Sequence, residues 1–135
     1  MFSLTHLFGA ITLAGVAAAT PAMCQGSITT QNLPNYIRAC SSGDGVTCNI
    51  LAQFLANEAE IRAMGLRYDL KIALNIAESG CDLGQPQSCL LAGRILGGAL
   101  TSPEVTPNRQ EANSYLTRAC DAGLEDACTV LANGS

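Results

Sequence analysis

The segment Cys40-Ser41-Ser42-Gly43-Asp44-Gly45-Val46-Thr47-Cys48 has the pattern Cys-x2-Gly-x4-Cys, which this chain of 135 residues contains three times. The other copies are Cys81-Gly84-Cys89 and Cys120-Gly123-Cys128, and the first cysteines of successive copies are 41 and then 39 residues apart. A fixed period of this size is typical of repeat proteins, in which each unit is one supersecondary element stacked on the next. The pattern therefore predicts a repeat architecture that uses six of the seven cysteines.

The spacing of the cysteines also constrains the helices that carry them. Two cysteines eight positions apart on one straight α-helix would lie about 12 Å apart, whereas a disulfide needs Cα atoms about 4.4–6.8 Å apart. Either the cysteines are unpaired, or the helix breaks between them and the chain turns back. The glycine in each copy favours the break, because glycine tolerates the left-handed conformation that ends helices. We therefore expect three helical hairpins with a disulfide at each corner: Cys40–Cys48, Cys81–Cys89 and Cys120–Cys128.

The flanking residues favour helices on both sides of each corner. Asp69 and Asn108 each lie twelve residues before the first cysteine of a pair, and both are good N-cap residues. Asn32 with Pro34 would start a shorter first helix. The predicted helices span 32–41, 46–58, 69–80, 86–97, 108–120 and 125–132, with an alternative in which 58–67 prolongs the second helix. The segment 98–107 is predicted to be an irregular loop, and no strand pattern is present.

The first 24 residues resemble a secretory signal. Their apolar run, Leu7 to Ala19, is too short to span a bilayer and is followed by small residues and a proline. We expect a signal peptide at 1–24 and a mature repeat domain at 25–135. Cleavage after Ala19 or Ala22, and an uncleaved anchor, remain alternatives. Cys24 is either removed with the signal or lipidated, and removal is favoured because Met23 is larger than the residue that normally precedes a lipidated cysteine.

Composition excludes several function classes. Charged residues make up 13% of the chain and the net charge is −4, which argues against nucleic-acid binding. His6 is the only histidine and lies in the signal, so the mature chain lacks Ser-His-Asp and Cys-His catalysis and the commonest metal ligand. Tyr68 stands three residues before Lys71, the only lysine, so the Ser-x-x-Lys motif of serine β-lactamases is absent. Seven residues between cysteines fit disulfides better than zinc knuckles. We expect no catalytic residue, cofactor or metal.

Two acidic clusters and two tyrosines remain as candidates for a site: Glu58 with Glu60, Glu125 with Asp126, and Tyr68 and Tyr115. Two carboxylates can form a glycosidase-like pair, but acidic residues are also common at the solvated start of a helix, where they interact favourably with its dipole. We favour the helix-start interpretation for both clusters. The tyrosines could contact a ligand on a concave face. For Tyr115 we favour packing between helices. For Tyr68 both roles, ligand contact and packing, stay possible.

The segments Asp69–Cys89 and Asn108–Ala132, with Tyr36–Ala52 as a partial third copy, resemble the Sel1-like repeat, a relative of the tetratricopeptide repeat. The resemblance is strongest over 112–132 and is to the cysteine-bearing version found in exported bacterial proteins, including the Helicobacter cysteine-rich proteins. The chain departs from the family in its longer period and in Gly80, where alanine is expected. The resemblance implies an all-α fold: an α/α superhelix, or solenoid, of about two and a half disulfide-linked hairpins whose inner face binds proteins or peptides.

Together these features predict an exported scaffold, periplasmic or secreted by a bacterium, that is not an enzyme. We expect a monomer that binds a protein or peptide of unidentified sequence, binds no nucleic acid and has no membrane span after signal removal. The alternative is a cell-wall-related penicillin-binding protein or weak β-lactamase, which only the resemblance implies. Incubation with a fluorescent penicillin distinguishes the two, because saturable labelling would support the alternative and its absence would reject it.

Overall fold

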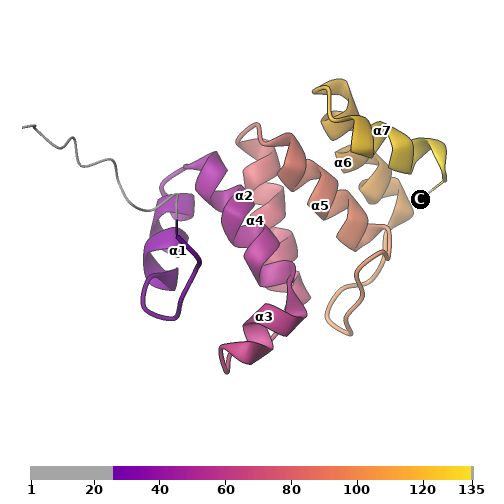
Figure 1. The fold of residues 1–135 in the computed structure, drawn as a ribbon. Coiled ribbons are helices and arrows are strands. Elements are labelled where there is room, and N and C mark those ends of the chain that lie inside the picture. Colours follow the sequence, from indigo (N-terminus) through magenta and orange to yellow (C-terminus); the bar gives the residue numbers. More distant parts are fainter. Residues whose placement is uncertain (1–25, 135) are drawn as a thin grey trace, which may run out of the picture.

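A computed structural model describes residues 26–134, and every regular element in that range is a helix. The expected signal peptide and Cys24 lie outside the described residues. All of the helices except α3 stack in chain order, from α1 at one end to α7 at the other (Figure 1). They are α1 (Leu33–Ser41), α2 (Gly45–Ala56), α3 (Glu58–Ala63), α4 (Leu70–Asp82), α5 (Pro86–Leu96), α6 (Arg109–Asp121) and α7 (Glu125–Ala132). The structure thus has the expected all-α class.

Three helical hairpins, α1–α2, α4–α5 and α6–α7, form the stack. Each first helix ends one residue past its first cysteine, and the chain then turns at a glycine with positive φ. These φ angles are 96° at Gly43, 87° at Gly84 and 94° at Gly123, a conformation that side chains other than glycine rarely adopt. Disulfides close the corners, with Cα separations of 4.6 Å for Cys40–Cys48, 4.6 Å for Cys81–Cys89 and 4.8 Å for Cys120–Cys128.

The caps explain where the first helices of the hairpins begin. The Asp69 side chain accepts hydrogen bonds from the backbone N–H groups of Lys71 and Ile72, and the Asn108 side chain accepts one from Glu111. Both predicted caps are confirmed. Asn32 stands at the start of α1, but its side chain accepts a hydrogen bond from the preceding Thr29 N–H instead of from the helix. As expected, α1 is shorter, with 9 residues against 13 in α4 and in α6.

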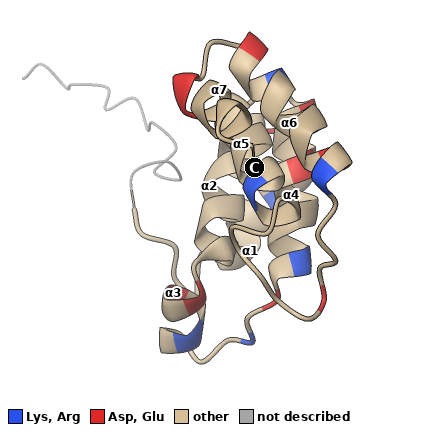
Figure 2. Ribbon diagram, turned by 90° about the vertical axis from the view of Figure 1, so that its right-hand side faces the viewer, with Lys and Arg blue, Asp and Glu red and all other residues tan. Residues whose placement is uncertain are grey.

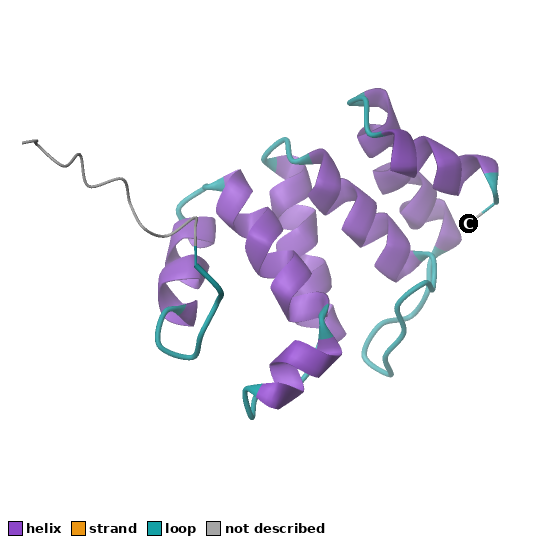
Figure 3. Cartoon of the chain, viewed as in Figure 1, coloured by secondary structure: helices purple, strands orange, loops and turns teal. Residues whose placement is uncertain are grey.

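The connections between hairpins are long, which accounts for the long repeat period. The alternative in which 58–67 prolongs the second helix is wrong, because α2 ends at Ala56 and Asn57 leaves the helical conformation with φ −89° and ψ 93°. The Asn57 side chain then caps the separate helix α3 by accepting a hydrogen bond from the Glu60 N–H. Helix α3 and the loop that follows α5 both lie at the same edge of the stack (Figures 1 and 3).

Small residues let successive hairpins pack closely. Leu51 and Ala52 of α2 are fully buried, as is Ala92 of α5; α2 packs on α4 and α5 packs on α6. At the corresponding positions of α7, Leu131 is half-buried and Ala132 is exposed, because no described helix follows to cover them. The buried core is therefore built from the contacts between hairpins as much as from each hairpin itself.

Position 80 holds a glycine where the resemblance leads us to expect alanine, and the packing around Gly80 explains this difference. A Cβ atom at Gly80 would lie 2.9 Å from the Cβ of Ser88 and would also collide with the Ser88 hydroxyl. Ser88 is fully buried and donates a hydrogen bond of 3.2 Å to the Asn49 side chain of the preceding hairpin. In the last hairpin the two corresponding residues are Ala119 and Ala127, both fully buried. The glycine therefore compensates for the larger serine opposite it.

Disulfide Cys120–Cys128 is expected to be the first one reduced. Its two cysteines are half-buried, whereas the other four are between 0% and 7% exposed. Because an attacking thiolate must reach a sulfur atom, the more accessible bridge should be reduced fastest. A time course in dithiothreitol under native conditions, with alkylation of the released thiols and mass spectrometry, would measure the order. Labelling of Cys40–Cys48 or Cys81–Cys89 before Cys120–Cys128 would contradict this expectation.

Candidate functional site

An open hollow of about 780 Å³ lies between the two long connections. The elements that line it, α3 and the loop that follows α5, lie at the same edge of the stack (Figure 1). Its wall on one side comes from the end of α2 and from α3, and its other wall comes from the loop. The lining residues are Ala56, Asn57, Glu58, Ala59, Arg62, Tyr68, Ala99, Leu100 and Thr101. The segments that lengthen the repeat therefore build this hollow.

The lining of this hollow is mainly apolar, with a charged pair among its residues. Tyr68 is half-buried, and its hydroxyl donates a hydrogen bond of 3.4 Å to the Ala56 carbonyl, which holds the ring against the end of α2. Burial, and after it the negative charges of Glu58 and Glu104, raise the pKa of Tyr68 above its usual value. The Arg62 Nε lies 2.8 Å from a Glu58 carboxylate oxygen, and both side chains are more than half exposed. The charges of this pair are thus already matched.

Two further hollows continue along α5. One, of about 370 Å³, is lined by Gly93, Arg94, Gly97, Gly98, Ala99 and Val130. The other, of about 250 Å³, is lined by Gln53, Gln87, Leu90, Leu91 and Arg94. Ala99 lines the first and second hollows, and Arg94 lines the second and third, so the second hollow connects the other two. We call the three hollows together the α5 groove.

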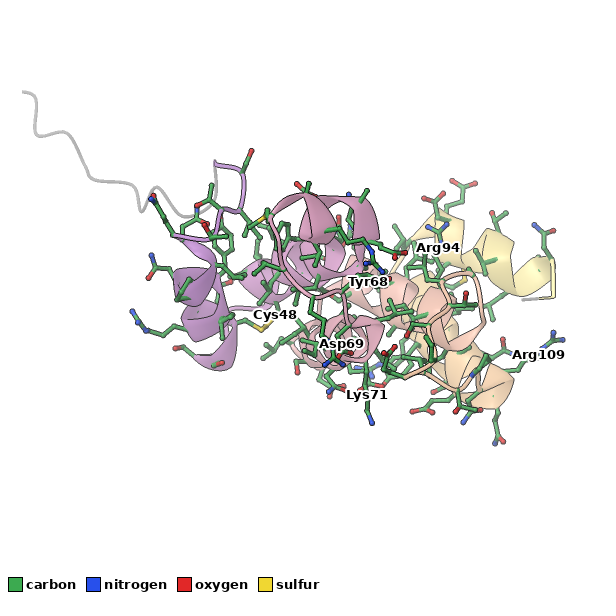
Figure 4. All side chains as sticks on the ribbon, turned by 90° about the horizontal axis from the view of Figure 1, so that it is seen from below. Cys48, Tyr68, Asp69, Lys71, Arg94 and Arg109 are labelled. Atoms are coloured by element: carbon green, nitrogen blue, oxygen red, sulfur yellow. A yellow bond between two sulfur atoms is a disulfide. The ribbon has the colours of Figure 1, made fainter. Side chains whose placement is uncertain are left out.

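Arg94 lies where two hollows of the α5 groove meet. Its side chain is exposed and forms no hydrogen bond or ion pair with any other residue of 26–134. Seen from below, Arg94 lies on the opposite side of the stack from Lys71 of α4 (Figure 4). Elsewhere in the described part of the chain, charged residues are spread over the ribbon without gathering on one face (Figure 2). Arg94 is therefore an isolated cation in a groove.

The solved structure of Helicobacter pylori cysteine rich protein B is similar to this one. The two superpose with a TM-score of 0.62 and 25% sequence identity over 76% of this chain and 72% of that chain. This chain has the Sel1-like repeat fold. No protein-family model matches its sequence, and no curated protein matches it either. The resemblance drawn from the cysteine pattern is confirmed, together with the helical solenoid that it implied.

The Sel1-like solenoid places both acidic clusters at helix starts. Glu58 and Glu60 lie in the first turn of α3, and Glu125 and Asp126 lie in the first turn of α7. Glu60 also accepts a hydrogen bond of 3.2 Å from the Asn57 side-chain amide, so the cap and the acidic residue hold each other at the start of α3. The helix-start interpretation is confirmed, and the two clusters belong to different parts of the stack (Figure 1). Within residues 26–134, no group of three or more metal-binding side chains is found.

Tyr115 packs between hairpins of the Sel1-like solenoid, as expected. It is half-buried and contacts both the central core cluster and the cluster under α6 and α7. The Arg118 guanidinium lies 5.8 Å from the centre of its ring. Burial, followed by the charge of Glu78 and a hydrogen bond to it, raises the pKa of Tyr115 to about 12. Burial also raises the pKa of Glu78.

The shifted pKa of Tyr115 predicts a loss of stability at alkaline pH. The unfolded chain should release this proton near the ordinary value of 10.0, whereas the native chain holds it to about 12. The contribution of Tyr115 is therefore complete below pH 10 and is lost as the pH rises through 12. Urea unfolding from pH 9 to 12 would measure this, with Tyr115→Phe expected to show a smaller fall in the free energy of unfolding. Equal falls in the two proteins would contradict the assignment.

The sequence did not point to Arg94, Ala99 or Leu100 as site residues. No motif surrounds them, and the nearest signal was the repeat period, whose excess length lies in the connections that line the α5 groove. Tyr68, whose role the sequence left undecided, hydrogen-bonds to the end of α2 and also lines the groove. None of the helices in 26–134 has the length and apolar character of a transmembrane span.

Proposed function

We propose that this protein is an exported, disulfide-stapled scaffold, not an enzyme, that binds a protein or peptide along the α5 groove. The observation that carries the proposal is the row of three hollows, two of them along α5 and one between α3 and the loop that follows α5. A row of shallow, open hollows suits an elongated ligand, such as a peptide segment, better than a compact small molecule. Small molecules usually occupy enclosed clefts that cover most of their surface.

The disulfides support a preformed groove. Each hairpin that contributes to it is closed by a disulfide at its corner, so little of the binding free energy is needed to order the scaffold. Such bridges persist in oxidising compartments. We accordingly propose that residues 1–24 act as a signal peptide and that 25–135 function as a monomer in the periplasm or outside the cell.

The processing and the pairing can be tested together. Non-reducing peptide mapping of the protein purified from cells should give an N-terminus at Gln25 and the bridges Cys40–Cys48, Cys81–Cys89 and Cys120–Cys128. Light scattering should give the mass of a monomer. An N-terminus at Met1 or a lipid on Cys24 would overturn the proposed processing, and any other pairing would overturn the stapled scaffold.

Binding along the α5 groove can be tested by filling it. Ala99 is exposed and lines two of the three hollows, so Ala99→Trp should obstruct the groove without disturbing the core. Ala122 is also exposed but lies in the α6–α7 corner, so Ala122→Trp is a matched control. Pull-down from periplasm and culture medium should recover a partner with wild type and Ala122→Trp but not with Ala99→Trp. Equal recovery by Ala99→Trp, or turnover of a substrate with no partner, would reject the proposal.

A further inference from the structure

We propose that the α5 groove selects peptide segments that carry a carboxylate between apolar side chains, with Arg94 as the contact for the carboxylate. This inference rests on the proposed function and adds to it the chemistry of the partner. It follows from the charges of the groove, from the position of Arg94 within it, and from the apolar residues on both sides.

The charges that line the groove leave one cation unmatched. Three charged residues line the three hollows: Glu58, Arg62 and Arg94. Glu58 and Arg62 pair with each other at 2.8 Å, whereas the Arg94 side chain forms no ion pair or hydrogen bond with any residue of 26–134. The groove therefore has a net positive charge although the whole chain has a net charge of −4. A negatively charged group on the ligand is the complement of this site.

The surroundings of Arg94 let a partner approach closely. Gly97, Gly98 and Ala99 follow it at the end of α5 and line the same hollow. These residues have little or no side chain, so the main chain of a bound segment can come near the guanidinium. The guanidinium offers a planar fork of N–H donors that matches the two oxygens of a carboxylate. Arg94 is thus placed to bind a carboxylate with two hydrogen bonds.

Apolar side chains flank this contact in both directions. Leu90 and Leu91 line the hollow towards α2, and both are only partly buried. Tyr68 and Leu100, also half-buried, line the hollow towards α3. A matching segment therefore has apolar residues on each side of its carboxylate. The carboxylate can come from an Asp or Glu side chain or from the C-terminus of the partner, and the experiment separates these sources.

The alternative role for Arg94 is purely structural. It lies in the last turn of α5, where a cation interacts favourably with the helix dipole. In that role, Arg94→Gln would alter stability slightly and would leave peptide binding unchanged. Peptide affinity is therefore the measurement that distinguishes the two roles.

The probe is a pair of random peptide libraries, one displayed with blocked C-termini and one with free C-termini. Peptides are selected from both for binding to the full, oxidised protein. We expect selected peptides to contain Asp or Glu beside apolar residues, or to need a free C-terminus. Synthetic peptides identify the source of the carboxylate. In one set Asn or Gln replaces the acidic residue, in the other the C-terminus is amidated, and the set that loses affinity shows which carboxylate is bound. Fluorescence anisotropy should show affinity about tenfold lower for Arg94→Gln, equivalent to about 1.4 kcal/mol.

Two further variants make the result specific. Arg109 of α6 is also exposed and has no ion pair within 26–134, and it lies outside the α5 groove, so Arg109→Gln should bind as wild type does. Arg94→Glu should select peptides with Lys or Arg instead of acids. Selected peptides without acids or free C-termini, or equal binding by Arg94→Gln, would overturn this inference while leaving peptide binding intact. If the libraries give no binder that Ala99→Trp weakens, the proposed function fails as well.

Discussion

Reduction of all three disulfides is expected to unfold the protein under conditions in which the oxidised chain is folded. The bonded cysteines are eight residues apart in each case, and chain-entropy arguments assign about 2.5 kcal/mol to closing a loop of this size. Three such bridges contribute about 7–8 kcal/mol, which is comparable to the total stability of about 5–15 kcal/mol of a typical domain. The helices are short as well, from 6 to 13 residues, and helices of this length are marginal without cross-links or packing.

Thermal melts followed by circular dichroism, with and without reductant, would measure this effect. Replacing one pair at a time by serine provides graded controls. Loss of Cys81–Cys89 should cost more than loss of Cys120–Cys128, because Cys81 and Cys89 are 1% and 4% exposed and lie between two other hairpins. Replacing these two cysteines by serine would place two hydroxyl groups in the middle of the stack. A melting curve that reductant leaves unchanged would show that packing alone holds the solenoid together.

Gly93→Ala is expected to destabilise the protein by about 1–3 kcal/mol, the usual cost of overpacking a core. Gly93 lies inside α5, where exchanging glycine for alanine would normally stabilise the helix by about 1 kcal/mol. Here a Cβ atom would lie 2.6 Å from Cγ and 2.8 Å from Cδ2 of Leu116, and 3.1 Å from the Ala112 carbonyl oxygen. Because the carbonyl belongs to the α6 backbone, the contact can be relieved only by separating α5 from α6. The sign of the change therefore tests the packing.

A double-mutant cycle with Leu116 identifies the cause. Leu116 is fully buried, so Leu116→Ala alone should cost about 2–5 kcal/mol. In the double variant the Leu116 contacts with the added methyl group are gone, so the combined loss should be smaller than the sum of the two single losses. Urea unfolding of the four proteins provides the numbers. Additive losses, or a more stable Gly93→Ala, would show that α5 and α6 are not as close as described.

The hairpin corners could be predicted because the forces that form them act over a few residues. A cysteine pair at this spacing can close only if the helix breaks, and Gly43, Gly84 and Gly123 supply the positive φ at the break. The caps at Asp69 and Asn108 act on backbone groups within three residues. The end of α2 was harder to predict. The residues of 58–63 suit a helix, and the break between α2 and α3 lies at a single residue, Asn57.

The sequence by itself determined the hairpins, their corners and the repeat, because each depends on neighbours close in the chain or on a covalent bond with fixed geometry. Only the tertiary structure decided how the hairpins meet. It explains Gly80 by Ser88 and Gly93 by Leu116, and it brings Tyr68 and Leu100 to opposite sides of one hollow. These contacts join residues that are between 8 and 32 positions apart in the chain. They arise where one helix packs on another, within a hairpin for Gly80 and Ser88 and between hairpins for Gly93 and Leu116, and no local pattern encodes this packing. The α5 groove with its unmatched Arg94 is a product of the same packing.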